Sequence, residues 1–251
     1  MKRRDFVRTS VGAGFVVATI PNGLMTRFAP QQSRGTMFDK IWDAHVIANL
    51  GGDDYLLQVD RCIGGRPNQI LEMLAEGVQI PHPEMFFNVP DHGVSTDPNR
   101  YTDLSLGSGW QQYEEHAERM RELGFNTFGQ FDPRYGIQHV VGPETGLSQP
   151  GMLLCAGDSD TCTPGAMGLI SWGGEDTDLV LRTGTIVRHR PMTMRVNVVG
   201  TLGPGLRAKD VILKIIAQLG TDGGNGYAVE YAGPVVRALP QDSRFSICNL
   251  A

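Results

Sequence analysis

The sequence predicts an α/β fold in which short buried strands alternate with amphipathic helices. From Thr36 onward, short apolar runs alternate with segments of helical periodicity, the order that stacked strand–helix units produce. Apolar residues make up 41% of the 251 residues, near the globular average, and the 32 glycines indicate many tight turns. A chain of this length can bury a substantial core without disulfides.

The first predicted elements are one strand and two helices. Residues 55–59 read as a strand, and residues 68–76 read as an amphipathic helix that ends at a glycine. Residues 111–123 form a stronger helix, because apolar side chains share one face, charged side chains fill the other, and Gly124 can cap the end.

The middle of the chain predicts two short buried strands, at residues 139–141 and 152–156, each followed by a turn. His139 would then lie at the end of a strand, shortly before Gly142. An ordered segment resumes at residues 179–187, after a cluster of glycines.

The last quarter of the chain predicts the beginning of a second α/β domain. The basic stretch 188–191 reads as a linker, so we expect domain 1 to occupy residues 35–190 and domain 2 to begin at residue 191. Residues 194–199 and 227–231 read as strands. Residues 208–219 give the strongest helix prediction, with a wide apolar stripe and a glycine directly after it.

Residues 1–34 read as a signal peptide of the twin-arginine type. Arg3 and Arg4 are followed by Asp5 and Phe6, and then by a mild apolar run. That run is about ten residues long, whereas a bilayer span needs about twenty, so we expect no stable membrane span. We therefore expect export to the periplasm in a folded state. The alternative is a basic tail on a cytoplasmic enzyme.

Charge and cysteine spacing argue against two classes of function. The chain has a formal charge of −5, and its basic residues are concentrated near the amino terminus, so the remainder is more acidic still. This argues against nucleic acid as a partner, because phosphate binding needs a basic face. The four cysteines are scattered without a C-x-x-C pair, so the spacing alone indicates no zinc or cluster site.

Four stretches of the chain are distinctive together: MFDKIWDAH at 37–45, DPRYGIQHVVGPE at 132–144, PGM through GDS at 150–159, and GGNGY through ICN at 223–249. They resemble stretches in the large subunits of 3-isopropylmalate dehydratases, which are members of the aconitase family. The order and spacing of the resemblance hold almost throughout the chain after the signal.

The resemblance implies an aconitase-type three-layer α/β/α domain followed by the start of a second α/β domain. It also implies a hydro-lyase that removes and adds water on a hydroxy-di- or tricarboxylate, with a place in leucine biosynthesis. The cofactor implied is a [4Fe–4S] cluster held by three cysteines. Those cysteines would lie beyond Ala251, so we expect the metal ligands, a C-terminal half and a small subunit to be supplied from elsewhere.

The resemblance also assigns roles to a histidine–carboxylate set. Asp91 and His92 resemble an acid pair in which the carboxylate orients an imidazole that donates a proton to the departing hydroxyl. His139 matches a second active-site histidine. The alternatives are a turn aspartate followed by a solvated histidine, and a structural histidine at position 139.

Further matches place Asp158 in the catalytic set and Ser159 and Asn249 in contact with substrate or cluster. Asp160 stands where the family has a histidine, and an anion there should weaken the binding of an anionic substrate. This departure keeps a second function open, namely a non-catalytic, exported carboxylate-binding or partner-docking remnant. The exact substrate and a pairing between Cys155 and Cys162 stay open.

Overall fold

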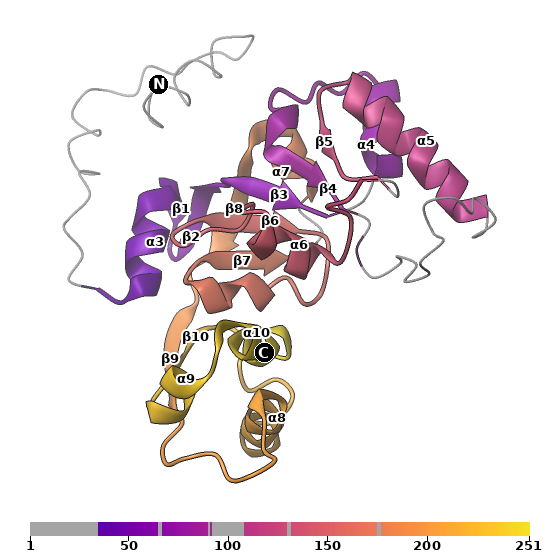
Figure 1. Ribbon diagram of the computed structural model, residues 1–251. Helices are drawn as coiled ribbons and strands as arrows, with labels where there is room; N and C mark the ends of the chain where they lie inside the picture. Colours follow the sequence, from indigo (N-terminus) through magenta and orange to yellow (C-terminus); the bar gives the residue numbers. More distant parts are fainter. Residues whose placement is uncertain (1–34, 65–66, 90, 92–107, 130–131, 175–176) are drawn as a thin grey trace. The chain divides into compact units, whose positions relative to one another are not determined.

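The computed structural model describes residues 35–64, 67–89, 91, 108–129, 132–174 and 177–251 (Figure 1). Residues 36–251 form one compact unit. The predicted signal peptide, residues 1–34, lies outside the described residues. None of the helices described is long and apolar enough to cross a membrane.

The largest sheet has five parallel strands in the order β5-β4-β3-β6-β7 (Figure 1). After β3 the chain adds β4 and β5 on one side, and it then places β6 on the other side of β3. Reversals of this kind mark the point where α/β proteins bind ligands, at the carboxyl ends of the strands. The strands are β3 Arg61–Ile63, β4 Phe86–Asn88, β5 Asn126–Thr127, β6 Leu153–Ala156 and β7 Ile170–Gly173.

Two smaller sheets accompany the parallel one. The first is antiparallel with the order β1-β2-β8, and the second pairs β9 with β10 in parallel. The pairing of β2 with β8 joins segments that are far apart in the sequence. The strands are β1 Val46–Gly51, β2 Asp54–Gln58, β8 Thr185–His189, β9 Met192–Asn197 and β10 Tyr227–Ala232.

Helices connect the strands and confirm the predicted α/β class. α4 lies between β3 and β4 in the chain, α5 between β4 and β5, and α6 between β5 and β6. Short 3₁₀ helices η2 (Pro83–Met85) and η4 (Thr163–Met167) precede β4 and β7. The helices are α3 Met37–His45, α4 Pro67–Ala75, α5 Ser108–Glu122, α6 Gln138–Glu144, α7 Thr177–Thr183, α8 Ala208–Leu219, α9 Pro234–Ala238 and α10 Gln241–Asn249.

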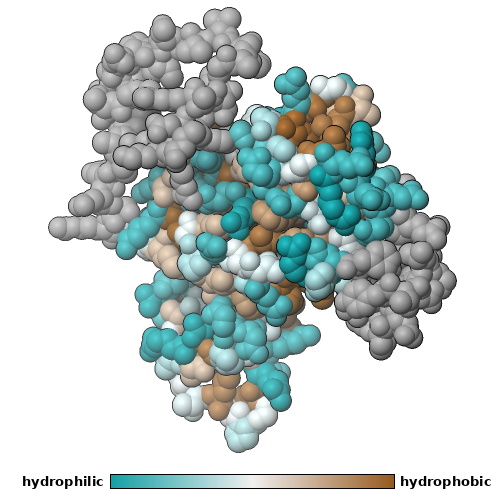
Figure 2. All heavy atoms as spheres, turned by 45° about the horizontal axis from the view of Figure 1, so that its top comes forward, coloured by the Kyte–Doolittle hydropathy of each residue, from teal (hydrophilic) through white to brown (hydrophobic). Residues whose placement is uncertain are grey.

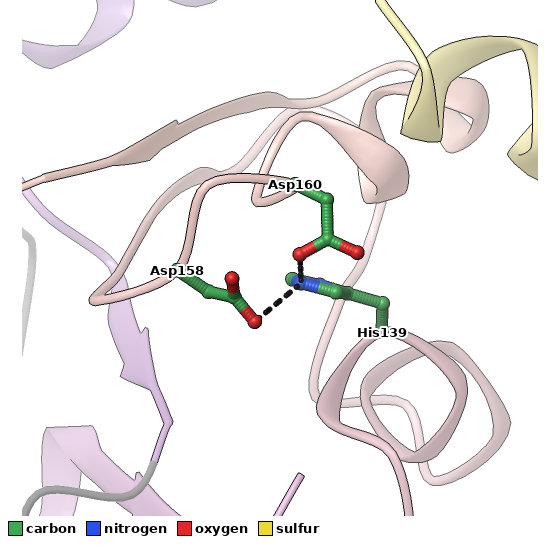
Figure 3. A group of neighbouring side chains, drawn as sticks. All are labelled: His139, Asp158 and Asp160. Carbon is green, nitrogen blue, oxygen red and sulfur yellow. Dashed lines mark hydrogen bonds and ion pairs between the residues drawn. The ribbon is translucent and has the colours of Figure 1, made fainter. Parts of the chain in front are cut away.

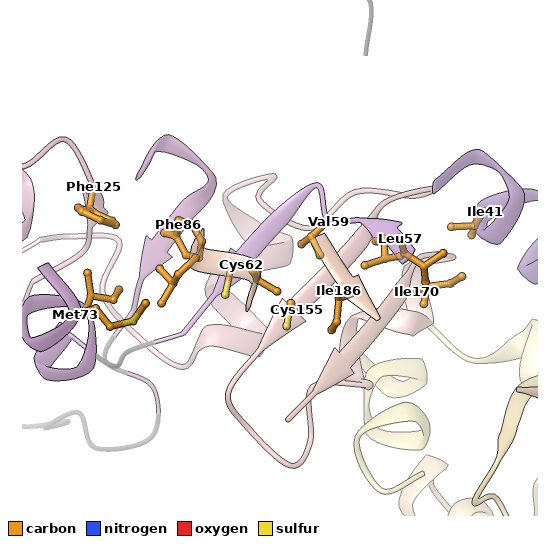
Figure 4. Close-up of a cluster of buried hydrophobic side chains, with 14 of the residues drawn as sticks. Ile41, Leu57, Val59, Cys62, Met73, Phe86, Phe125, Cys155, Ile170 and Ile186 are labelled. Carbon is orange, nitrogen blue, oxygen red and sulfur yellow. The ribbon is translucent and has the colours of Figure 1, made fainter. Parts of the chain in front are cut away.

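Three clusters of buried apolar side chains form the core. The largest contains Trp42 and Leu57, both with no exposed surface, and extends along the parallel sheet (Figure 4). A second cluster lies around Val141, and a third joins α8 to α10 through Ile212 and Ile247. Figure 2 shows apolar areas between hydrophilic ones on the face it draws, which is normal for a globular surface. The division at residue 190 stays a prediction.

Helix α3 was not among the predicted elements, although its start carries a clear sequence signature. Thr36 Oγ1 accepts a hydrogen bond from the Asp39 N–H at 3.2 Å, and Asp39 Oδ2 accepts one from the Thr36 N–H at 2.8 Å. This reciprocal capping box satisfies two N–H groups that the first turn leaves unpaired. The helix then buries Ile41 and Trp42 in the core.

The predicted strand at residues 139–141 is wrong, because these residues belong to helix α6. Three apolar residues in a row do not distinguish a strand from a helix. The Val141 N–H donates to the Ile137 carbonyl at 2.8 Å, and the Val141 side chain is buried in the second cluster. His139 therefore lies in the first turn of a helix rather than at a strand end.

The predicted linker 188–191 is also wrong in part. Arg188 and His189 belong to β8, and the Arg190 N–H donates to the Asp53 carbonyl at 2.7 Å. The Arg190 guanidinium reaches Asp39 Oδ1 at 2.7 Å and so ties this segment to α3. The ordered segment 179–187 contains the end of α7 and most of β8.

Candidate functional site

A cavity of about 210 Å³ lies at the carboxyl ends of β3, β4 and β6. The residues that end or follow these strands supply much of its wall: Gly64 follows β3, Asn88 ends β4, and Asp158 follows β6. Two carboxylates, Asp91 and Asp158, line it together with apolar side chains such as Phe86. The described part of its wall contains no lysine or arginine, so the cavity favours cations over anions.

His139 brings an imidazole to the same strand edge (Figure 3). Its Nε2 lies 2.9 Å from Asp160 Oδ1 and 3.7 Å from Asp158 Oδ2. The histidine is buried, with 7% of its surface exposed. Two carboxylates from one loop therefore face the same ring nitrogen, which can hold a proton between them.

Gln138 links the imidazole to the cavity and was not predicted as a site residue. Its Nε2 donates to Asp158 Oδ2 at 2.8 Å, and its backbone N–H donates to Asp91 Oδ1 at 3.3 Å. Only 4% of its surface is exposed, and its Oε1 has no hydrogen-bond partner among the described residues. The only feature of the sequence that could have indicated Gln138 as a site residue is its position directly before the candidate histidine His139.

Asp158 is held as a carboxylate. Burial raises the pKa of its carboxyl, but hydrogen bonds from its neighbours outweigh burial and lower the pKa to about 2. The neighbours are the Asp91 side chain, the Ser159 N–H, the Asp160 side chain and the Gln138 amide. The Ser159 N–H bond is short, at 2.6 Å. Asp158 is therefore a fixed negative charge near neutral pH.

Asp160 is positioned by helix α10. Asn249, the last residue of that helix, donates from Nδ2 to Asp160 Oδ2 at 2.7 Å and to Thr163 Oγ1 at 2.9 Å. The Thr163 hydroxyl donates in turn to the Asp160 carbonyl at 2.6 Å. One carboxylate oxygen of Asp160 is thus anchored by an amide, while the other faces His139.

Two glycines let the loops approach one another. A Cβ added at Gly173, the last residue of β7, would overlap the carbonyl oxygen of Asp158. Gly64 has a φ of +144° and would place a Cβ 2.9 Å from Gln138 Oε1. Side chains at either position would displace the loop that carries Asp158 or the Gln138 amide.

The structure brings together most of the predicted site residues. His139, Asp158, Asp160 and Asn249 form one connected group. Asp91 joins it through its hydrogen bonds with Asp158 and Gln138, and it adopts a φ of +61°, a conformation that aspartate tolerates better than most residues.

The two remaining predicted site residues are Ser159 and His92. Ser159 is exposed, and its hydroxyl is 3.5 Å from Asp158 Oδ1. His92 lies outside the described residues, so its predicted role as an acid is not tested.

All four cysteines lie in the described part of the chain, where they form two separate pairs. Cys62 and Cys155 face each other on the neighbouring strands β3 and β6, deep in the core (Figure 4). Cys162 donates from Sγ to the Cys248 carbonyl at 3.0 Å. The pairing left open between Cys155 and Cys162 is thus not favoured, because each lies beside another cysteine.

The environment of these cysteines disfavours the thiolate form. A hydrogen bond with Cys155, together with burial, holds the pKa of the Cys62 thiol well above its usual range. Burial raises the pKa of Cys162, and burial beside Cys162 raises the pKa of Cys248 to about 12. Cluster iron binds thiolates from residues that surround one point. The cysteines of this chain therefore do not fit a [4Fe–4S] cluster.

The fold and the site define an α/β protein with acid–base groups at the switch point of a parallel sheet. Comparison with protein families matches residues 39–251 to the description "Aconitase family (aconitate hydratase)". The chain belongs to the aconitase family, a family that implies a [4Fe–4S] cluster.

Named relatives agree with this assignment. The chain is 40% identical over 221 residues to the "3-isopropylmalate dehydratase large subunit 1" of Bradyrhizobium diazoefficiens, covering 86% of this chain and 46% of that protein. It is 37% and 38% identical over 222 residues to 3-isopropylmalate dehydratase large subunits of Bacteroides fragilis and Bacteroides thetaiotaomicron, covering 86% of this chain and 47% of each. The chain spans about half the length of these relatives.

Proposed function

We propose that this chain supplies the imidazole-and-carboxylate wall of a hydro-lyase that acts on a hydroxy-di- or tricarboxylate. One observation carries the proposal: His139 Nε2 faces Asp158 and Asp160 at the carboxyl edge of the parallel sheet, in a chain of the aconitase family. The relatives are named for 3-isopropylmalate, and we extend that substrate class, with a role in leucine biosynthesis, to this chain as part of the proposal.

The chemistry of dehydration fits these side chains. Removing water requires one group that takes a proton from carbon and another that gives a proton to the departing hydroxyl. An imidazole can take up or give a proton, and the carboxylates of Asp158 and Asp160 that face His139 Nε2 orient its ring. Asp158 stays ionised and fixes the Gln138 amide beside the cavity.

We propose that the remaining parts come from another polypeptide or from a longer natural chain. The cysteines here do not fit the cluster, and the cavity wall described has no basic group for a substrate carboxylate. We propose a C-terminal half and a small subunit as partners, because the relatives are named large subunits and extend to about twice the matched length.

Complementation in trans tests this proposal. The 251-residue chain would be mixed anaerobically with the C-terminal half and small subunit of the Bacteroides fragilis enzyme, and its cluster reconstituted. We expect turnover of 3-isopropylmalate, followed by the absorbance of the unsaturated product, and no turnover when His139→Gln replaces the wild-type chain. A chain that forms the complex without any turnover would contradict the proposal. The chain alone should show no cluster absorption after reconstitution.

A second function is favoured by Asp160. This residue engages the imidazole that a catalyst would use, and a site with that pairing suits a non-catalytic carboxylate-binding or docking remnant. Calorimetry with malate and citrate distinguishes the two functions. Tight binding of either acid by the chain alone, without turnover in the complementation experiment, would favour the remnant.

We also propose that the chain is exported by the twin-arginine route. The support is the Arg3-Arg4-Asp5-Phe6 motif followed by a short, mild apolar run. Replacing Arg3 and Arg4 with lysine should retain the protein in the cytoplasm, as measured by fractionation of a host that has the pathway. The matched control is Lys2→Arg, which leaves the pair intact and should be exported normally. Equal export of both variants would contradict the twin-arginine route, and absence of the wild-type chain from the periplasm would favour the cytoplasmic alternative.

A further inference from the structure

We propose that His139, Asp158 and Asp160 form a binding site for one divalent transition-metal ion. This inference concerns the same three residues as the proposed hydro-lyase function, but the ion would be bound by the side chains of this chain alone. It therefore does not depend on the cluster or on a second polypeptide.

The three ligand atoms already converge. Each residue offers one atom, and these atoms all lie within 4.8 Å of one another. Two of the separations are 2.9 Å and 3.7 Å, both measured from His139 Nε2 (Figure 3). Adjacent ligands around an ion with bonds of about 2.1 Å are about 3 Å apart, so only a small movement of Asp158 is required.

The groups behind the ligands support such a site. Metal-bound carboxylates and histidines are usually oriented by hydrogen bonds to their remaining atoms. Asn249 holds Asp160 Oδ2, which leaves Oδ1 toward His139. The Ser159 N–H holds Asp158 Oδ1, which leaves Oδ2 toward the same nitrogen.

Gln138 provides an independent indication of a ligand. Its amide lies beside the three groups, with Nε2 2.8 Å from Asp158 Oδ2 and 3.5 Å from His139 Nε2. The side chain is more than nine-tenths buried, yet Oε1 has no hydrogen-bond partner among the described residues. In the structure Nε2 faces these groups and Oε1 faces Gly64. A half-turn of the amide exchanges the two atoms and would point the oxygen at the proposed ion as a fourth ligand.

The charge of the site also calls for a cation. Two carboxyl groups, those of Asp158 and Asp160, face the same nitrogen of a single imidazole. In the described part of the chain, neither Asp158 nor Asp160 forms an ion pair with a lysine or arginine. A bound ion would offset the excess negative charge and give the cavity an attraction for carboxylate ligands.

The donor set predicts which ions bind. An imidazole nitrogen favours transition-metal ions over Mg²⁺ and Ca²⁺, and carboxylates are compatible with both groups. We therefore expect the affinity to increase from Mg²⁺ through Mn²⁺ and Co²⁺ for this site. Cys162 and Cys248 offer a competing thiol pair, which the experiment must distinguish.

Titration of the 251-residue chain with CoCl₂ tests the site. Calorimetry should show one ion per chain, and the visible spectrum should show weak d–d bands without the strong near-ultraviolet band of a cobalt–thiolate bond. His139→Gln and Asp160→Asn should each weaken binding at least about 100-fold, and Asn249→Ala about 10-fold, because Asn249 only orients a ligand.

The matched control is Asp54→Asn, which changes an exposed His189–Asp54 pair with the same 2.9 Å separation. Cobalt affinity should be unchanged in this variant. A folded wild-type chain without stoichiometric binding, a thiolate band, or equal affinity in His139→Gln would overturn the proposal.

Pulsed EPR of the Mn²⁺-loaded wild-type chain measures the coupling between the ion and its ligand nitrogens, and this test needs no variant. It should show coupling to one imidazole nitrogen. Absence of that coupling would also overturn the proposal, even where the variants fail to fold.

Discussion

Two buried histidines in this protein, each in contact with an aspartate, differ in the groups that surround the contact. His45 Nε2 lies 2.7 Å from Asp60 Oδ2, and His45 Nδ1 lies 2.7 Å from the Ile41 carbonyl. Asp60 Oδ2 also accepts the Leu153 N–H at 3.0 Å. Both ring nitrogens therefore have partners from the protein, and neither His45 nor Asp60 lines the cavity at the carboxyl ends of β3, β4 and β6.

The pair formed by His139 and Asp160 differs in what surrounds it. A second carboxylate faces the same nitrogen, a buried amide oxygen of Gln138 lacks a partner among the described residues, and Asp158 borders a cavity. Proximity of histidine and aspartate is thus common to both regions. The difference is whether the surrounding groups leave polar atoms and space for a ligand.

Removing Asp60 should have the largest effect on stability. Asp60→Ala leaves the His45 Nε2 and the Leu153 N–H without their acceptor in the core, so we expect the free energy of unfolding to fall by about 3–5 kcal/mol. Urea denaturation followed by circular dichroism measures this loss. A loss below about 1 kcal/mol would show that the contact between His45 and Asp60 does not stabilise the fold, which would contradict the distinction drawn between the two histidines.

Filling the space at Gly173 should have the next largest effect. In Gly173→Ala the new methyl group overlaps the Asp158 carbonyl, and we expect a loss of about 2 kcal/mol together with weaker cobalt binding. Gly165→Ala is the matched control, since a Cβ there contacts nothing within 4 Å. If both variants lose the same stability and the same cobalt affinity, the absence of a side chain at Gly173 does not determine the position of Asp158.

Acid should reveal the ionised state of Asp158. Its pKa is lowered from 3.8 to about 2, so it contributes stability above pH 4 that is lost as the pH falls toward 2. After allowance for its partial exposure, we expect this contribution to be about 1 kcal/mol. Asp158→Asn should reduce that part of the pH dependence of unfolding. A wild-type and a variant curve of the same slope would argue against the lowered pKa.

The exposed pair of His189 and Asp54 should have the smallest effect. Its side chains are 70% and 58% exposed, and Asp54→Asn should change the free energy of unfolding by less than about 0.5 kcal/mol. The same urea denaturation measures it. A larger change would mean that solvent exposure does not reduce the stabilising contribution of this pair below that of the contacts made by the buried histidines.

Periodicity predicted the helices that have a wide apolar stripe and a terminal glycine. Helix α8 occupies residues 208–219 as predicted, because its apolar residues repeat along one face over three turns. Helix α6 was mistaken for a strand, because its start has no side-chain cap and it contains Pro143, which usually ends a helix. Packing of Val141 in the core favours the helical conformation of these residues, and a short stretch of sequence does not show that packing.

The candidate site was predicted by resemblance rather than by local pattern. The resemblance predicted His139, Asp158, Asp160 and Asn249 as site residues. Only the fold brings them together, across a sequence separation of up to 110 residues. Gln138 was missed because its role depends on burial and on an unpartnered oxygen. Neither property can be read from a glutamine in a sequence.

The bond between Asn249 and Asp160 has a consequence for biosynthesis. The two residues are 89 positions apart, so a chain emerging from a ribosome can pair β3 with β6 and place His139 beside Asp160 well before α10 exists. Until that helix emerges and docks, one oxygen of Asp160 lacks its amide donor. The carboxyl edge of the parallel sheet can therefore form early in translation, whereas the carboxylate of Asp160 is held in place only after α10 has been synthesised.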